Sequence, residues 1–436
     1  MPKDNEKKAY QFNDQETVKN VNSLTLAFAK AVAANQKDKG DNLIVSPYNA
    51  LTCLSMVAKG ADKNTREELA KALFGTAAKE LDDQVNRLAS LNTAVLAANQ
   101  GQVDLKTANG VWTNKNLAPL NNTFADELKK IFGAEISAED FSDKTVPDKI
   151  NAWAGKNTNN LIDKIVGELK PDDFAVLASA LYFKGQWTEK FDKQATEDRL
   201  FTADGGNKSV TPTMHKSYKK DQILYQDGGD YQAVAITYGE KNIEENKVPT
   251  MRLILVRPRD ENISARDWLS QQAGATVPAW MGDDTFNNMP VTVELPRLDI
   301  KQKHDLIPAL QDMGIRDAFT NAADFSLLVK GGSKDIAIGK ASHDVVFKTD
   351  EEGSEAAAVT TVTMIMKSAM APPRKPIDLK FDRSFVFALQ DIKTGAVIFV
   401  GAVNKPNSEM KPALFDLPDA PKHDKANPGH QGPKLA

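Results

Sequence analysis

The chain has 436 residues, 41% of them apolar and 26% charged, and its formal net charge is −4. This length is sufficient for one large hydrophobic core or for two to three ordinary domains. The near-neutral charge argues against a nucleic acid as an obligatory partner, and no apolar run reaches the roughly 18 residues needed to cross a membrane.

Residues 1–15 are rich in charge and are expected to form a flexible N-terminal segment. The opening M-P-K-D-N-E-K-K lacks the apolar core of a signal peptide. The protein is therefore expected in the cytoplasm if the chain is full-length, and outside the cell if a signal was removed. Sequons at Asn121, Asn207 and Asn262 do not decide between these compartments, because such triplets also arise by chance.

Helical periodicity dominates the first third of the chain. An amphipathic pattern predicts a helix from Thr17 to Ala34. Ser46 and Pro47 combine a capping serine with a first-turn proline, and they predict a largely buried helix from Tyr48 to Lys59. Cys53 lies in this helix, and as the only cysteine it is expected to be a buried, unreactive thiol. Further helices are expected at 65–73, 81–99 and 122–132, and long strands at 103–112 and 174–183.

Strand patterns dominate the rest of the chain. From Thr188 to Thr292 strands alternate with polar loops, and the charged run from Glu240 to Val248 indicates an exposed insertion. A further strand is expected at 341–347, where apolar and polar residues alternate. Residues 407–436 are rich in proline and charge, which predicts a disordered C-terminal tail.

No motif in the sequence indicates catalysis or a bound cofactor. The five histidines have no close spacing, so no metal site is expected. The patterns that hold phosphates or dinucleotides, or that present a nucleophilic serine, do not occur. We therefore expect neither catalytic residues nor a cofactor, and the protein is not expected to be an enzyme.

The stretch from Glu351 to Ile377 has an unusual composition. Its first part, E-E-G-S-E-A-A-A, holds small residues after a glycine, and its second part, V-T-T-V-T-M-I-M, is rich in β-branched residues. Small side chains can enter between neighbouring strands without clashing. Lys367 and Ser368 follow, and then a proline-rich run that cannot continue a ladder. Taken alone, the stretch also fits an ordinary strand followed by a loop.

Two motifs resemble one protein family. Residues 351–358 resemble the hinge of inhibitory serpins, and residues 381–406, F-D-R-S-F-V-F-A-L-Q-D-I-K-T-G-A-V-I-F-V-G-A-V-N-K-P, resemble the C-terminal signature of that family. The resemblance is nearly continuous from Asn42 to Pro406, so residues 16–406 are interpreted as one serpin domain. It implies an α+β fold with three β-sheets, about nine helices and an exposed reactive-centre loop. It also implies helices at 150–158 and 306–313 and a strand at 293–298, each of which resembles an element of the family.

The resemblance also implies a function, inhibition of a serine protease that attacks the loop as a suicide substrate. The cleaved loop then inserts into the main sheet as a new strand. In this family the scissile bond usually lies 14 residues beyond the hinge glycine, and 353 + 14 = 367, which gives the bond between Lys367 and Ser368. A lysine there favours trypsin-like proteases, whose specificity pocket carries an aspartate. Because the segment from Ser368 to Phe381 is long for the family, Arg374 and Met366 remain alternative cleavage positions.

The same resemblance implies three structural sites. The hinge comprises Glu351, Gly353, Ser354, Glu355, Ala356, Ala357 and Ala358. The shutter, a polar cluster beneath the main sheet, comprises Ser46, Asn49, Ser179 and His343. The breach, where the loop begins to enter the sheet, comprises Trp187, Arg297 and Glu351, with the last two as a candidate ion pair of exposed residues. At period two, Ser354 and Ala356 share the face expected to point into the core, and Ala357 points outward.

The expected partner is a serine protease, and we expect a monomer that binds neither nucleic acid nor membrane. The helix at 81–99 has few basic residues on its polar face, whereas the corresponding helix of heparin-binding serpins is basic, so no glycosaminoglycan site is expected. The alternative is a non-inhibitory serpin that acts as a chaperone or carrier. Bulky or charged hinge residues would favour it, and Ala356 to Ala358 include none.

Overall fold

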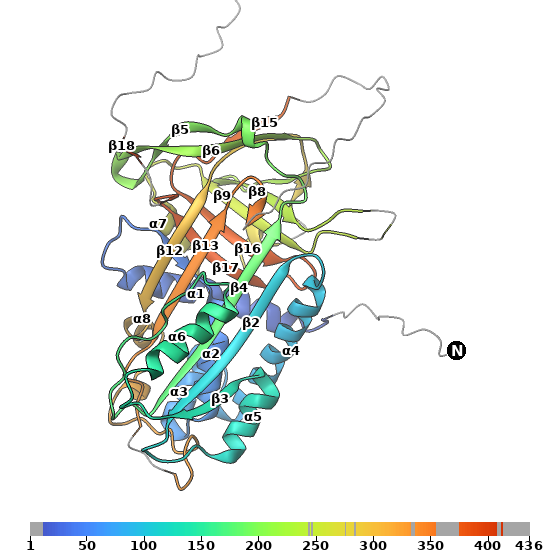
Figure 1. Ribbon diagram of the computed structural model, residues 1–436. Coiled ribbons are helices and arrows are strands. Elements are labelled where there is room, and N and C mark those ends of the chain that lie inside the picture. The colour runs from blue at the N-terminus through green and yellow to red at the C-terminus, as the bar shows by residue number, and fades with distance from the viewer. Residues whose placement is uncertain are drawn as a thin grey trace, which may run out of the picture.

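The computed structural model describes residues 12–242, 245, 247–274, 276–282, 285–332, 336–354, 375–407 and 411–412. The long strands β2, β4, β12 and β13 run side by side, helix α6 crosses in front of them, and strands β5, β6 and β15 gather at the upper end of the molecule (Figure 1). This arrangement is the α+β architecture that the sequence analysis expects.

Eight α-helices occur among the described residues, one fewer than the approximate number expected. They are α1 (Gln15–Asn35), α2 (Pro47–Lys59), α3 (Lys63–Phe74), α4 (Leu81–Asn99), α5 (Asn122–Phe132), α6 (Val146–Asn157), α7 (Ala265–Gln271) and α8 (Ile307–Asp312).

Local chemistry explains where these helices begin. Asp14 caps α1 by accepting a hydrogen bond from the Thr17 N–H, so this helix starts within the segment expected to be flexible. Ser46 caps α2, and Pro47 occupies its first turn. Helix α6 begins at Val146, four residues before the expected Ile150, because Pro147 also suits a first turn.

The largest sheet has seven strands in the order β1, β17, β16, β9, β8, β7, β10. A smaller sheet has the order β15, β11, β6, β18, and β5 also pairs with β6. Their bounds are β1 (Leu43–Val45), β5 (Glu197–Thr202), β6 (Lys208–Tyr218), β7 (Leu224–Asp227), β8 (Tyr231–Tyr238), β9 (Met251–Pro258), β10 (Asn287–Asn288), β11 (Val291–Pro296), β15 (Ile377–Lys380), β16 (Phe385–Asp391), β17 (Val397–Val403) and β18 (Lys411–Pro412).

The third layer, called the main sheet here, is divided into two parts. One part contains β14 (Gly353–Ser354), β4 (Ala175–Gln186), β2 (Asp104–Asn114) and β3 (Glu135–Glu139), in that order. The other part pairs β12 (Leu298–Asp305) with β13 (Ser342–Thr349). The single strand expected at 293–298 is in fact the end of β11 and the start of β12, which belong to different sheets, with Arg297 between them.

The described part of the C-terminal segment also takes part in a ladder. Strand β18 pairs antiparallel with β6 within the stretch expected to be a disordered tail. No helix among the described residues is both long enough and apolar enough to cross a membrane.

Candidate functional site: the hinge and the divided sheet

A gap separates the two parts of the main sheet, because no ladder joins β4 to β13 among the described residues. The backbone pairing shows which groups face this gap. The Asn114 N–H donates to the Phe174 carbonyl, so even-numbered residues of β4 bond to β2 and odd-numbered ones face the gap. The Leu306 N–H likewise donates to the Ala341 carbonyl, so even-numbered residues of β13 face the gap from the other side.

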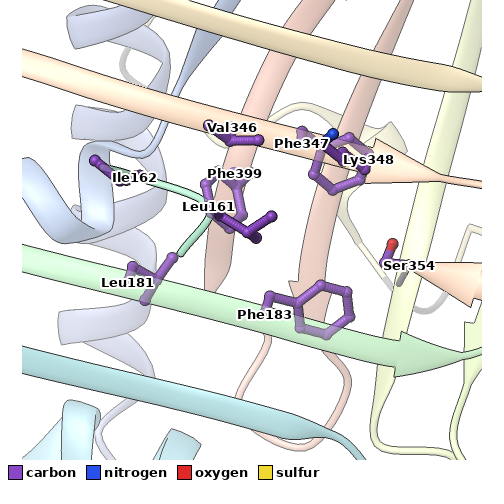
Figure 2. Close-up of a pocket in the computed structure, with 9 residues that line it drawn as sticks. All are labelled: Leu161, Ile162, Leu181, Phe183, Val346, Phe347, Lys348, Ser354 and Phe399. Carbon is purple, nitrogen blue, oxygen red and sulfur yellow. The ribbon is translucent and has the colours of Figure 1, made fainter. Parts of the chain in front are cut away.

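A small cavity lies in this gap. Leu181 and Phe183 line it from β4, Phe347 lines it from β13, and Ser354 lies at one end (Figure 2). Leu161, from the segment that follows α6, also lines it. This segment turns at Asn159 and Asn160, whose φ angles are 50° and 60°, a left-handed conformation that asparagine adopts more readily than most residues. The gap is thus bordered by backbone groups and lined mostly by apolar side chains.

The hinge begins at the open end of the gap. After β13 the chain reverses, and Gly353 and Ser354 pair with Gln186 and Gly185 of β4. Gly353 has a φ of 142°, and a Cβ there would lie 2.1 Å from the Gly185 carbonyl oxygen, so only glycine fits. Ser354 is buried, and its hydroxyl lies 3.3 Å from the hydroxyl of Tyr238. The two residues of β14 therefore already occupy the start of the position that an additional strand beside β4 would take.

The remaining reactive-loop residues of the sequence analysis lie outside the described residues. These are Glu355, Ala356, Ala357, Ala358, Met366, Lys367, Ser368 and Arg374. Ile377 is described, and as the first residue of β15 it pairs with Val291 of β11.

Trp187 joins the hinge turn to the end of β4. Its backbone N–H donates to the Glu352 carbonyl at 2.9 Å, and its indole N–H donates to the Asp350 carbonyl at 2.7 Å. Its ring stacks on that of Tyr238, with 4.2 Å between the centroids. The breach is therefore held by both hydrogen bonds and aromatic packing.

Glu351 is anchored by a bidentate ion pair. Arg297 donates to its carboxylate from Nε at 2.9 Å and from Nη2 at 2.7 Å, and the Thr196 hydroxyl donates to the same carboxylate. Burial by itself raises the pKa of Glu351, but these donors outweigh burial and lower it. The sequence predicts an exposed pair, whereas Glu351 is only 2% exposed and Arg297 remains partly in solvent.

Sequence reasoning missed a second carboxylate at the hinge. Glu352 forms ion pairs with Lys190 at 2.7 Å and with Lys193 at 3.3 Å, and both lysines follow β4 closely in the sequence. The hydrogen bond from Lys190 is the main cause that lowers the pKa of Glu352. Only the folded structure brings these residues together, because they lie about 160 positions apart along the chain.

The shutter residues gather around the start of α2. His343 of β13 accepts a hydrogen bond at Nε2 from the Ser46 N–H at 2.9 Å, and the Ser46 hydroxyl donates to the Ile398 carbonyl at 2.8 Å. Asn49 and Ser179 contact each other on the side of β4. The first turn of α2 is therefore bonded to both sides of the gap.

A second buried histidine belongs to this cluster. His304 of β12 pairs directly across the ladder with His343, and its Nε2 lies 2.9 Å from the Ile44 carbonyl oxygen. Burial lowers the pKa of His304, and burial together with this neighbour lowers the pKa of His343 to about 3. The alternating pattern of β12 was the available signal for His304, but the expected strand ended at Leu298.

Among the described residues no group of three or more histidine, cysteine, aspartate or glutamate side chains is arranged to hold a metal ion. What the site offers is two rows of backbone donors and acceptors that face each other. Such rows can accept an additional strand.

Comparisons with known proteins agree with this architecture. Residues 19–406 match the family model described as "Serpin (serine protease inhibitor)". Serpin B6 of Pongo abelii is 30% identical over 379 residues, 85% of this chain and 95% of the relative. The leukocyte elastase inhibitor of Equus caballus is 27% identical over 381 residues, 86% of this chain and 96% of the relative. The native-state crystal structure of the thermophilic serpin Tengpin has a TM-score of 0.75 at 25% identity and covers 91% of this chain and 95% of its own. The chain belongs to the serpin family.

Proposed function

We propose that this serpin inhibits a trypsin-like serine protease as a suicide substrate, with Lys367–Ser368 as the scissile bond. The observation that carries the proposal is the pairing of Gly353 and Ser354 with the end of β4, above a gap that no other ladder crosses among the described residues. A cleaved loop can extend this pairing along β4 without breaking any ladder between β4 and β13.

Extension of the observed register predicts the pairing that such an insertion would have. The partners Gly353–Gln186 and Ser354–Gly185 both sum to 539, so continuation brings Ala356 opposite Phe183 and Ala358 opposite Leu181. Small loop residues would then lie beside the bulky side chains that border the cavity. This complementarity supports an inhibitor over a chaperone or carrier, for which small residues in the hinge have no evident use.

The chemistry belongs to the protease. Its serine attacks the carbonyl carbon of Lys367, the peptide nitrogen of Ser368 leaves with a proton, and an acyl-enzyme ester remains. Insertion of the loop from Gly353 to Lys367 moves this ester by 14 residue steps, or about 46 Å at roughly 3.3 Å per residue. Displacement over this distance distorts the protease before water can hydrolyse the ester.

The driving force is the pairing of backbone groups along the gap. About a dozen new hydrogen bonds at about 1 kcal/mol each contribute on the order of 10 kcal/mol. Inward-facing loop side chains gain additional free energy by burial against the apolar lining of the cavity.

The test is to incubate the protein with trypsin and to look for a covalent complex that survives SDS. A trypsin variant without its nucleophilic serine is the matched control, because it binds the loop but cannot form the ester. We expect the complex with active trypsin only. Complete cleavage of the loop without any complex would reject the inhibitory function and favour the chaperone or carrier.

A further inference from the structure

Two side chains of α2 lie against the gap-facing edge of β4. Asn49 is buried, and its Nδ2 donates to the Ser179 carbonyl at 2.8 Å, while its Oδ1 accepts from the Ser179 hydroxyl at 2.5 Å. One helical turn later, the sulfur of Cys53 lies 3.7 Å from the Leu177 carbonyl oxygen. Ser179 and Leu177 are odd-numbered residues of β4, so these carbonyls belong to the row that faces the gap.

The Cys53 sulfur also receives the backbone N–H of Ser179. This hydrogen bond lowers the pKa of the thiol, although burial has the larger effect and raises the pKa to about 12. A protonated thiol is a weak donor as well as a weak acceptor, so one sulfur can serve both the Ser179 N–H and the Leu177 carbonyl.

The spacing of the two side chains matches the spacing of the strand. Residues four apart on a helix lie on the same face about 6 Å apart, and residues two apart on a strand are about 6.6 Å apart. Asn49 and Cys53 can therefore reach two successive gap-facing residues of β4 at the same time.

The inserting loop would need the same groups. Continuation of the register brings Thr360 opposite Ser179 and Val362 opposite Leu177, since both pairs sum to 539. The Trp187 N–H donates to the Glu352 carbonyl, so these two residues form a hydrogen-bonded pair of the antiparallel ladder. Such pairs alternate along a ladder, so odd-numbered residues of β4 would bond to even-numbered residues of the loop. The N–H groups of Thr360 and Val362 would thus bond to the carbonyls that Asn49 and Cys53 now contact.

We propose that Asn49 and Cys53 substitute for the backbone of the missing strand in the uncleaved protein, and that they release β4 when the loop inserts. This inference rests on the proposed function. It makes the two side chains positioning residues that stabilise the uncleaved form selectively. In the cleaved form the loop backbone satisfies the same β4 groups, so the loss of Asn49 then leaves no acceptor without a partner.

The experiment compares Asn49→Ala with Asn22→Ala. Asn22 is the matched control because its buried amide also bonds to backbone, to the Gly395 carbonyl at 2.9 Å and the Val397 N–H at 2.9 Å, and neither group belongs to β4 or β13. Each variant is melted uncleaved, and again after loop cleavage by a metalloprotease, which forms no acyl-enzyme.

We expect Asn49→Ala to lower the melting midpoint of the uncleaved protein by about 1 to 3 °C and that of the cleaved protein by less than half as much. Asn22→Ala should lower both midpoints equally. Cys53→Ala should follow Asn49→Ala with a smaller difference between the two forms, because the thiol bonds more weakly. If Asn49→Ala does not fold, the melting midpoints of Cys53→Ala test the inference in its place.

Equal shifts in both forms for Asn49→Ala, or for Cys53→Ala in its place, would overturn the inference. The parent protein separates this failure from failure of the proposed function. If cleavage does not raise the melting midpoint of the parent, insertion itself is rejected. If cleavage raises it and the variant shifts are equal, only the role of Asn49 and Cys53 is rejected.

Discussion

Lys367 carries the protease specificity of the proposed reaction. Replacement by glutamate should abolish inhibition of trypsin-like enzymes, because a carboxylate would face the aspartate in their specificity pocket. The measurement is the second-order rate constant for inhibition of trypsin by Lys367→Glu and by the parent.

Mass spectrometry of the cleaved products locates the bond independently. If Lys367→Glu retains full inhibition, the scissile bond lies elsewhere, and the fragment masses then distinguish Arg374 from Met366.

His343 makes the stability of the protein depend on pH. Burial and the neighbouring His304 hold the pKa of His343 at about 3 in the folded protein, below its ordinary value of 6.5. The unfolded chain therefore takes up a proton that the folded protein does not, and stability should fall as the pH decreases from about 6.5 toward 3. The slope for each such histidine approaches about 1.4 kcal/mol per pH unit.

Denaturant unfolding of the parent and of His343→Asn across this pH range measures the effect. We expect the free energy of unfolding of the variant to depend less steeply on pH, because unfolding of the variant takes up one proton fewer. An unchanged slope would assign the pH dependence to carboxylates instead.

At the level of elements, the face that the inserted strand presents to the core separates an inhibitor from a substrate. Ser354 is buried against Tyr238, so the alternation of a strand places Ala356 on the same inward face and Ala357 outward. Arginine at 356 would bring an unpaired charge into the core at a cost of several kcal/mol. Insertion should slow while hydrolysis of the acyl-enzyme continues, so Ala356→Arg should be cleaved without trapping the protease.

Ala357→Arg is the matched control, with the same side chain on the outward face. The stoichiometry of inhibition should rise several-fold for Ala356→Arg and change little for Ala357→Arg. An equal rise in the stoichiometry of inhibition for both substitutions would reject the assignment of Ala356 to the inward face. An unchanged stoichiometry for Ala356→Arg would count against insertion of the loop.

For the whole molecule, the uncleaved protein should be the less stable of two folded forms. Cleavage between Glu351 and Ile377 frees the loop to pair along the gap, and on the order of 10 kcal/mol of new hydrogen bonding should raise the melting midpoint by roughly 10 °C. Calorimetry before and after limited proteolysis tests this, and an unchanged midpoint would count against insertion.

Local patterns were sufficient to predict most of the elements and the family. Helix α4 begins and ends at the predicted residues, because its apolar stripe and its flanking residues act locally. The hinge motif identified Glu351, but not its burial, because burial depends on Arg297 and Thr196, which the fold brings from distant positions. The ion pairs of Glu352 and the position of Cys53 against β4 were missed for the same reason.

The register of β14 on β4 also limits how the length of the loop can vary. Side chains alternate between the two faces of a strand, so one residue added between Ser354 and Met364 would turn every later inward side chain toward solvent. Two added residues would restore the alternation. In the proposed mechanism, the part of the loop that inserts should therefore tolerate insertions or deletions of an even number of residues. The segment between Lys367 and β15 does not insert in this mechanism, so its length is exempt from this parity.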